Sequence, residues 1–315
     1  MKTYFIWPEG SITTALKKIH YVIDSNKIES ILFKMFPSGY PVLCSSGRSS
    51  LYLILNFLKK NRHHKIGLFP YANQCVTDSV SRITTPCFGE ESKNCDLRII
   101  YHQWGYVQEK DVKNDTIDDC VDSLCVPGSN LFPSNSNFEI WSLPKIIGST
   151  SGSVIWCKNK KDSLKLKLLR DSSSYHSFQW CLRLLSKKIS FIYDHWNGRE
   201  YNSPKTSKIQ NGEIYFLLKK WDEFIKDRKI KLNFLWEFSV KGLIKPKNRL
   251  PCVVPIYYDD SILNKIKDKF PSGSRMMEKI NYDGSRKLLK IIPFPIHQEV
   301  DLDWIKGFVK SLRNN

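Results

Sequence analysis

The sequence predicts an α/β fold with a large, mostly parallel sheet, followed by a smaller α+β unit. Two observations carry this prediction. In the first two thirds of the chain, short apolar segments typical of strands alternate with segments typical of helices, and that order favours parallel strands. From about residue 203, long charged helices precede separate strands. We therefore expect a large α/β domain over residues 1–202 and a small α+β domain over residues 203–315.

The individual elements follow from local periodicity and composition. A short apolar strand at 41–44 leads into a helix that carries Leu51, Ile54, Leu55 and Leu58 on one face. The further strands expected in the first unit are 65–70, 97–102, 116–121, 138–142 and 153–156, with a helix over 75–83. The second unit is expected to hold a helix over 214–229, strands at 252–257 and 290–294, and a final helix over 302–312.

Composition limits the class of protein. The chain has 315 residues, of which 41% are hydrophobic, enough for a large core. No apolar run of about 18 residues is present, so we expect no membrane insertion. The first residues lack the long apolar core of a signal peptide, which favours a cytoplasmic protein. The nine cysteines are scattered and form no CxxC pair, so reduced thiols are expected.

The formal net charge of +18 favours an anionic partner. The lysines are nevertheless spread along the chain, with the densest runs at 158–167 and 219–231, and no nucleic-acid-binding motif is present. We therefore expect no nucleic-acid partner. A basic nucleic-acid-binding protein remains the alternative from another functional class.

A serine-rich turn between the first strand and its helix is a candidate anion site. It reads Ser-Ser-Gly-Arg-Ser-Ser over residues 45–50. Gly47 permits close approach of the backbone, and the helix amides with the hydroxyls of Ser49 and Ser50 suit a phosphate. Arg48 is a candidate for the same phosphate or for an anionic substrate. The alternatives are a serine that only caps the helix and an arginine on its surface.

Two further features complete a pattern. Asp118 and Asp119 end an apolar strand, where a parallel sheet opens toward ligands. Lys145 is a single amine in a largely apolar segment, where a desolvated lysine can act as a nucleophile. Pyridoxal phosphate (PLP) needs a phosphate cradle, an aspartate for its ring nitrogen and a lysine for its aldehyde. Taken alone, the aspartates are also explained as caps and Lys145 as a turn residue.

The order of these motifs resembles the DegT/DnrJ/EryC1 family of PLP-dependent sugar aminotransferases. SSGRSSLYLIL (45–55) resembles the family's SGTAALHLAL, YHQWGY (101–106) its HLYG, and IDDCVDS (117–123) its EDAAQA. IWSLPKIIGSTSGSVIWC (140–157) resembles the FSFxxxK segment with its glycine-rich turn, and residues 290–312 resemble the closing LPxHxxL and last helix. The resemblance implies the type I aminotransferase fold with a seven-stranded sheet.

The resemblance also implies roles for individual residues. It places Lys145 at the Schiff-base lysine, Asp119 at the partner of the pyridine nitrogen, and Gly47, Arg48, Ser49 and Ser142 at the phosphate.

The sequence departs from the family pattern in three places. Ser142 lies three residues before Lys145, where the family serine lies five before. Gln74 takes the place of the aromatic residue that stacks on the cofactor, so that Tyr71 or Trp104 is expected to stack instead. Residues 170–185 lack the Gly-x-Asn-x-Arg segment by which a partner subunit reaches the cofactor.

The resemblance implies transfer of an amino group, from glutamate, to a nucleotide-linked keto sugar in the synthesis of O-antigen or capsule. A homodimer is implied as well. Two alternatives remain within the same fold: a sugar dehydratase, in which histidine tends to replace the lysine, and a non-catalytic binding or regulatory protein.

Overall fold

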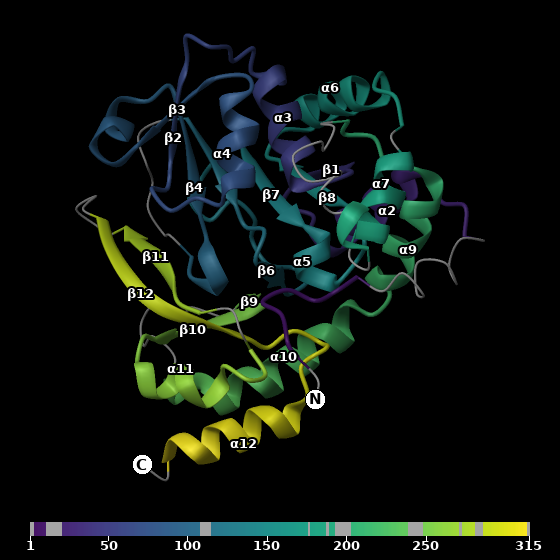
Figure 1. Cartoon of the computed structure of the whole chain (residues 1–315). Helices are drawn as coiled ribbons and strands as arrows, with labels where there is room; N and C mark the ends of the chain where they lie inside the picture. The colour runs from purple at the N-terminus through teal and green to yellow at the C-terminus, as the bar shows by residue number, and fades with distance from the viewer. Residues whose placement is uncertain are drawn as a thin grey trace.

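A seven-stranded sheet forms the centre of the protein (Figure 1). The computed structural model describes residues 3–10, 21–107, 115–175, 177–186, 189–192, 203–238, 248–270, 273–280 and 286–313. In spatial order the strands are β1 (Tyr40–Cys44), β8 (Ser153–Cys157), β7 (Phe138–Ser142), β5 (Thr116–Asp119), β4 (Leu97–Tyr101), β2 (Lys65–Leu68) and β3 (Thr85–Phe88). The predicted α/β fold with its seven-stranded sheet is confirmed.

The sheet is mostly parallel. Strand β8 runs antiparallel to both β1 and β7, whereas the described pairs between β7, β5, β4, β2 and β3 are parallel. The carboxyl ends of the parallel strands therefore meet at one edge, which is where such sheets bind ligands.

Alternating side chains supply a separate core on each face of the sheet. On β8, Ile155 and Cys157 pack toward α3 (Gly47–Phe57), α4 (Gln74–Ser81) and α6 (Lys160–Asp171). Val154 and Trp156 belong to the core on the opposite face, which includes α2 (Ser25–Met35) and α9 (Lys208–Leu218). Helix α7 (Ser177–Ser186) follows α6 in the chain, and Nε1 of its Trp180 donates to Oγ1 of Thr150 at 3.1 Å.

The C-terminal part contains a second, antiparallel sheet of β10 (Val253–Tyr257), β12 (Arg286–Pro295) and β11 (Arg275–Ile280). Helices α10 (Trp221–Leu235), α11 (Asp260–Ile266) and α12 (Leu302–Arg313) lie on the side of this sheet away from the large sheet (Figure 1). A two-stranded pairing of β6 (Ser123–Cys125) with β9 (Arg249–Pro251) links it to the first part of the chain. One core continues across the link, where Trp221 of α10 stacks on Trp141 with ring centroids 5.9 Å apart.

Several elements differ from the sequence prediction. The expected helix over 214–229 is two helices, because the chain breaks at 219–220 between α9 and α10. Strand β3 was not predicted, since it is four residues long and contains Pro86, which an edge strand tolerates. The turn expected around Lys145 is a short helix, α5 (Leu143–Ile147).

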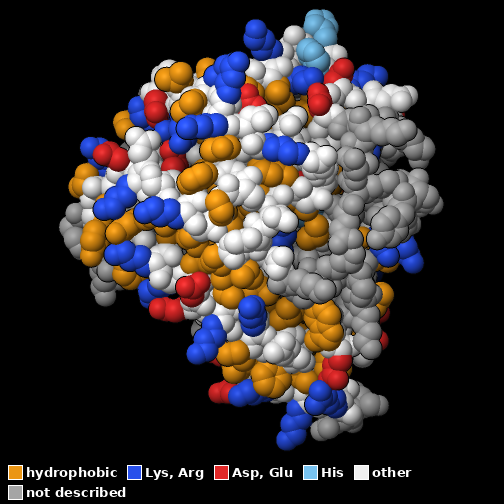
Figure 2. Space-filling model, turned by 180° about the vertical axis from the view of Figure 1, so that it is seen from behind, with side chains coloured by type: hydrophobic (Ala, Val, Ile, Leu, Met, Phe, Trp, Pro, Cys, Tyr) orange, Lys and Arg blue, Asp and Glu red, His pale blue; other side chains and the backbone are white. Residues whose placement is uncertain are grey.

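Two properties of the surface agree with the composition. Within the described residues, every helix is too short or too polar to cross a lipid bilayer. Figure 2 shows lysine and arginine side chains spread over the rear face rather than gathered in one patch.

Candidate active site

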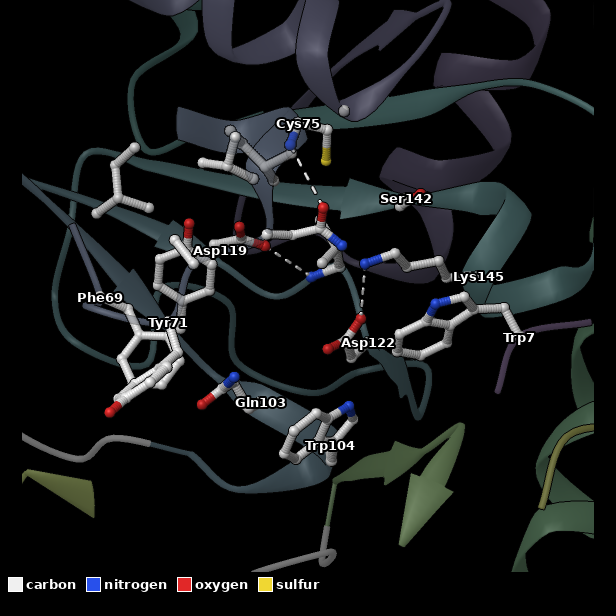
Figure 3. A pocket seen from close by; sticks show the side chains of 18 of the residues that line it. Trp7, Phe69, Tyr71, Cys75, Gln103, Trp104, Asp119, Asp122, Ser142 and Lys145 are labelled. Carbon is white, nitrogen blue, oxygen red and sulfur yellow. Dashed lines mark hydrogen bonds and ion pairs between the residues drawn. The ribbon is translucent and has the colours of Figure 1, made fainter. Parts of the chain in front are cut away.

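A cavity of about 870 Å³ opens at the carboxyl edge of the large sheet. Its wall is formed by the residues that follow β1, β2, β4, β5 and β7, so that segments distant in sequence face one space (Figure 3). Residues 274–276 and Lys290 add a side from the C-terminal sheet, and Ile6 and Trp7 add one from the N-terminal segment. The cavity therefore draws on both sheets.

Lys145 enters this cavity from α5. Proline at 144 suits the first turn of a helix, and the helix ends at Gly148, whose φ of +74° is readily adopted only by glycine. The Nζ atom of Lys145 lies 3.1 Å from Oδ1 of Asp122 and 4.5 Å from the ring centroid of Trp7. Figure 3 shows the amine next to both side chains, with a dashed line to Asp122.

The two adjacent aspartates of β5 have different environments, because successive side chains of a strand point to opposite faces. Asp118 is fully buried, accepts a hydrogen bond of 2.7 Å from Ser136 and pairs with Nε2 of His102 at 3.0 Å. Burial alone raises the pKa of Asp118, but His102 and the serines more than offset it and hold the pKa below its usual value. Asp119 lines the cavity.

Lys145 and the two nearby carboxylates shift one another's pKa values. Burial raises the pKa of Asp119 to about 6, against the opposing effect of Lys145. Burial also raises the pKa of Asp122, again opposed by Lys145. For Lys145, burial acts to lower the pKa, but the charges of Asp122 and Asp119 outweigh it and the pKa is raised. The charges of the two carboxylates therefore favour the ammonium form of Lys145.

The predicted phosphate turn divides into two parts. Ser46 caps α3: its Oγ accepts from the Ser49 amide at 3.2 Å, and the Ser49 hydroxyl accepts from the Ser46 amide at 3.0 Å. Ser49 is fully buried and is not among the residues that line the cavity. Gly47 and Arg48 do line it, so the amino-terminal end of α3 faces the cavity. Burial lowers the pKa of the Arg48 guanidinium, which still carries its charge.

The remaining predicted residues also reach the cavity. Ser142 lines it from the end of β7. Tyr71 lies exposed at the cavity and Trp104 lies buried in its wall, whereas Gln74 is exposed and is not a lining residue. Trp104 has the left-handed φ of +49°, which is unusual for a bulky residue. Its indole N–H is buried and has no hydrogen-bond partner among the described residues.

Asp122 and Trp7 were not predicted from sequence. Asp122 follows Asp119 by three residues, and this close acidic spacing was the available signal. Trp7 is brought to the cavity by tertiary contacts alone, so no local pattern marks it.

A comparison with protein-family models matches residues 28–314 to a family described as "Putative PLP-dependent aminotransferase". The chain belongs to this family. PLP, the cofactor predicted from the motif pattern, is confirmed at the level of the family. A comparison with curated protein sequences gives no match.

Solved aminotransferase structures share the fold of this aminotransferase over nearly its whole length. PseC from Helicobacter pylori, an aminotransferase involved in the biosynthesis of pseudoaminic acid, has a TM-score of 0.65 at 13% identity and covers 99% of both chains. The aminotransferase TlmJ from Streptoalloteichus hindustanus has a TM-score of 0.64 at 12% identity, over 98% of this chain and 97% of that one. A DegT DnrJ EryC1 StrS aminotransferase from Brucella abortus has a TM-score of 0.62 at 11% identity, over 96% of each chain.

The residues at the cavity fit PLP chemically. An amine, a carboxylate and the amino-terminal end of an 11-residue helix face the same space, and these groups suit the aldehyde, the ring nitrogen and the phosphate respectively.

Proposed function

We propose that this aminotransferase uses Lys145 and Asp119 to transfer an amino group from glutamate to a nucleotide-linked keto sugar. One observation carries the proposal: Lys145, Asp119 and the amino-terminal end of α3 face a single cavity at the carboxyl edge of the sheet. The order of these groups along the chain is the order that the sequence motifs required.

Lys145 has two tasks in this proposal. Its amine would condense with the cofactor aldehyde with loss of water, which requires the neutral form, so the ammonium proton would first pass to a neighbouring base such as Asp122. Once an amino donor had taken its place, the neutral amine would remove the proton from the donor α-carbon and pass it to the cofactor, as general base and then general acid. PLP supplies the electron sink that makes this proton removable.

Asp119 holds the ring nitrogen in its protonated form. A buried carboxylate is costly when unpaired, and a pyridinium partner offsets that cost. Asp119 is 8% exposed and receives a 3.2 Å hydrogen bond from the Val121 amide, which fixes its orientation. The buried rings of Phe69, Tyr101 and Trp104 help to keep water from the site.

The substrate class is supported by charge and by likeness. Arg48, Arg275 and Lys290 line the cavity and suit the phosphates of a nucleotide-linked sugar. The motifs resemble those of sugar aminotransferases, and PseC, which shares the fold, takes part in the biosynthesis of pseudoaminic acid. We place the reaction in the cytoplasm, in the synthesis of O-antigen or capsule, and propose a homodimer as the active form.

Absorption spectroscopy of the purified protein with PLP tests the proposal. We expect a yellow band that borohydride reduction fixes to the peptide containing Lys145, and that Lys145→Ala loses. Lys160→Ala, a surface lysine of α6, serves as the matched control and should keep the band. Addition of glutamate should then shift the band. A protein without a trapped lysine would overturn the assignment and favour the non-catalytic alternative.

A further inference from the structure

The N-terminal segment 3–10 crosses the active site, although nothing in its own sequence marks it as functional. Trp7 presents the face of its indole to Nζ of Lys145, with 4.5 Å between the nitrogen and the ring centroid. Asp122 faces the same nitrogen at 3.1 Å (Figure 3). An aromatic face attracts a cation and has little interaction with a neutral amine.

We propose that Trp7 is a positioning residue for Lys145: its indole face and the carboxylate of Asp122 hold the lysine as an ammonium ion in the protein that has not yet bound the cofactor. This inference rests on the proposed function, because it assumes that Lys145 is the reactive lysine. It goes beyond that function by assigning the lysine side chain a defined position before the cofactor binds.

The ring position is fixed by the way in which the segment is attached to the C-terminal part. The Tyr4 amide donates to the carbonyl of Lys269 at 2.7 Å, and its hydroxyl donates to Asp301 at 2.5 Å. The carbonyl of Phe5 accepts from Nε2 of His297 at 3.0 Å. These contacts lie just before Trp7 in sequence and set the path of the chain.

The residues that follow Trp7 in the chain are held as firmly as those before it. The Glu9 amide donates to Oε2 of Glu299 at 2.9 Å. Gly10 packs so closely that an added Cβ would lie 2.9 Å from the carbonyl oxygen of Ser149. Pro8 lies against Gly148, at the end of the helix that carries Lys145. With anchors on both sides, Trp7 has little freedom to leave the lysine.

The two contacts on the amine act in the same direction. A carboxylate and an aromatic face both favour the ammonium form, and together they explain how a partly buried lysine stays charged. The other titratable groups near Lys145 are Asp119, Cys75 and Cys252. Asp119 also favours the ammonium form, so the contribution of Trp7 must be separated from that of two carboxylates.

Competitive labelling of lysines in the full chain, freed of cofactor, can separate the effect of Trp7 on Lys145 from the effects of the two carboxylates. The protein is treated with trace acetic anhydride across a pH range, and acetylation of Lys145 is read by peptide mass spectrometry with surface lysines as internal references. The rate follows the neutral amine, so its midpoint reports the pKa of Lys145, while its plateau reports access of the reagent.

Trp7→Leu keeps apolar volume and removes the aromatic face, and Trp7→Phe keeps a face. We expect Trp7→Leu to lower the midpoint by about 0.5–1 pH units, which is about three- to tenfold more neutral amine at a fixed pH, and Trp7→Phe to restore most of it. Ile6 lines the same cavity from the same segment, so Ile6→Ala serves as the control. It should change only the plateau of the labelling rate.

A wild-type midpoint in Trp7→Leu, or an equal shift in Trp7→Phe or Ile6→Ala, would overturn the inference. The readout is independent of catalysis. If the wild-type protein failed to bond PLP at Lys145, the proposed function would fail while the midpoint measurement kept its meaning.

Discussion

Replacing Asp119 with asparagine should stabilise the cofactor-free protein while weakening its hold on PLP. Burial raises the pKa of Asp119 from 3.8 to about 6, so the folded state binds the proton more tightly than the unfolded state does. Stability therefore falls as pH rises through the window of about pH 4–6. At about 1.4 kcal/mol per pH unit, the ionised carboxylate costs the folded protein about 3 kcal/mol above that window. Asparagine has no such cost.

The assay is urea unfolding of the cofactor-free wild type and Asp119→Asn, followed by tryptophan fluorescence. The variant should gain about 0.5 kcal/mol at pH 4 and about 3 kcal/mol at pH 8, because the cost grows with ionisation. Asp118→Asn is the matched control on the same strand. The pKa of Asp118 is lowered, so this variant should lose stability at pH 8 and lose less as the pH falls toward 4. A less stable Asp119→Asn at pH 8, or a gain that ignores pH, would refute the reasoning.

Three further predictions concern the surroundings of the site. Arg249→Met should cost about 3–5 kcal/mol in urea unfolding, because Arg249 reaches buried Glu139 at 2.6 and 3.0 Å; a loss below about 1 kcal/mol would contradict this. Gly152→Ala should lower Tm more than Gly128→Ala: both have positive φ, but only at Gly152 would the added Cβ lie 2.7 Å from Ile214. Asp122→Asn should lower the labelling midpoint of Lys145 further than Trp7→Leu does, since the charge of Asp122 raises the pKa of Lys145; an unchanged midpoint would show that Asp119 alone sustains it.

The sequence predicted the large sheet well because each of its main strands carries a strong local signal. Residues 138–142 and 153–156 are apolar runs bounded by serine, glycine and asparagine, and their structural counterparts β7 and β8 match to within a residue. The helix after β1 could be placed because Leu51, Ile54 and Leu55 recur at helical spacing, although it begins earlier, at Gly47. Strand β6, by contrast, is three residues long and exists through its pairing with β9, which lies more than 120 residues away in the chain.

The residues of the site also fall into those with a local sequence signal and those placed by distant contacts. Lys145, Asp119 and the serine turn lie at or just after the ends of strands, and the topology of a parallel sheet brings such positions together. Ser49 was assigned to the phosphate, but its hydroxyl is occupied by the helix cap, since cap and phosphate site share one composition. Trp7 could not be predicted from the sequence, because the contacts that bring it to Lys145 come from the far end of the chain.

The position of β8 bears on how the protein is made. Strand β1, which leads into the anion turn, has no direct neighbour in β2; it pairs with β8, more than 100 residues later, and β8 in turn supports β7 and the lysine. A nascent chain that has emerged only to residue 150 therefore contains β1 without its partner strand. The anion turn after β1 and the lysine after β7 can take their places in the cavity wall only after β8 has inserted between β1 and β7. Closure of such long loops slows folding. A ribosome that pauses before residue 153 should hold a chain unable to capture the cofactor, whereas one that has released the whole protein should not.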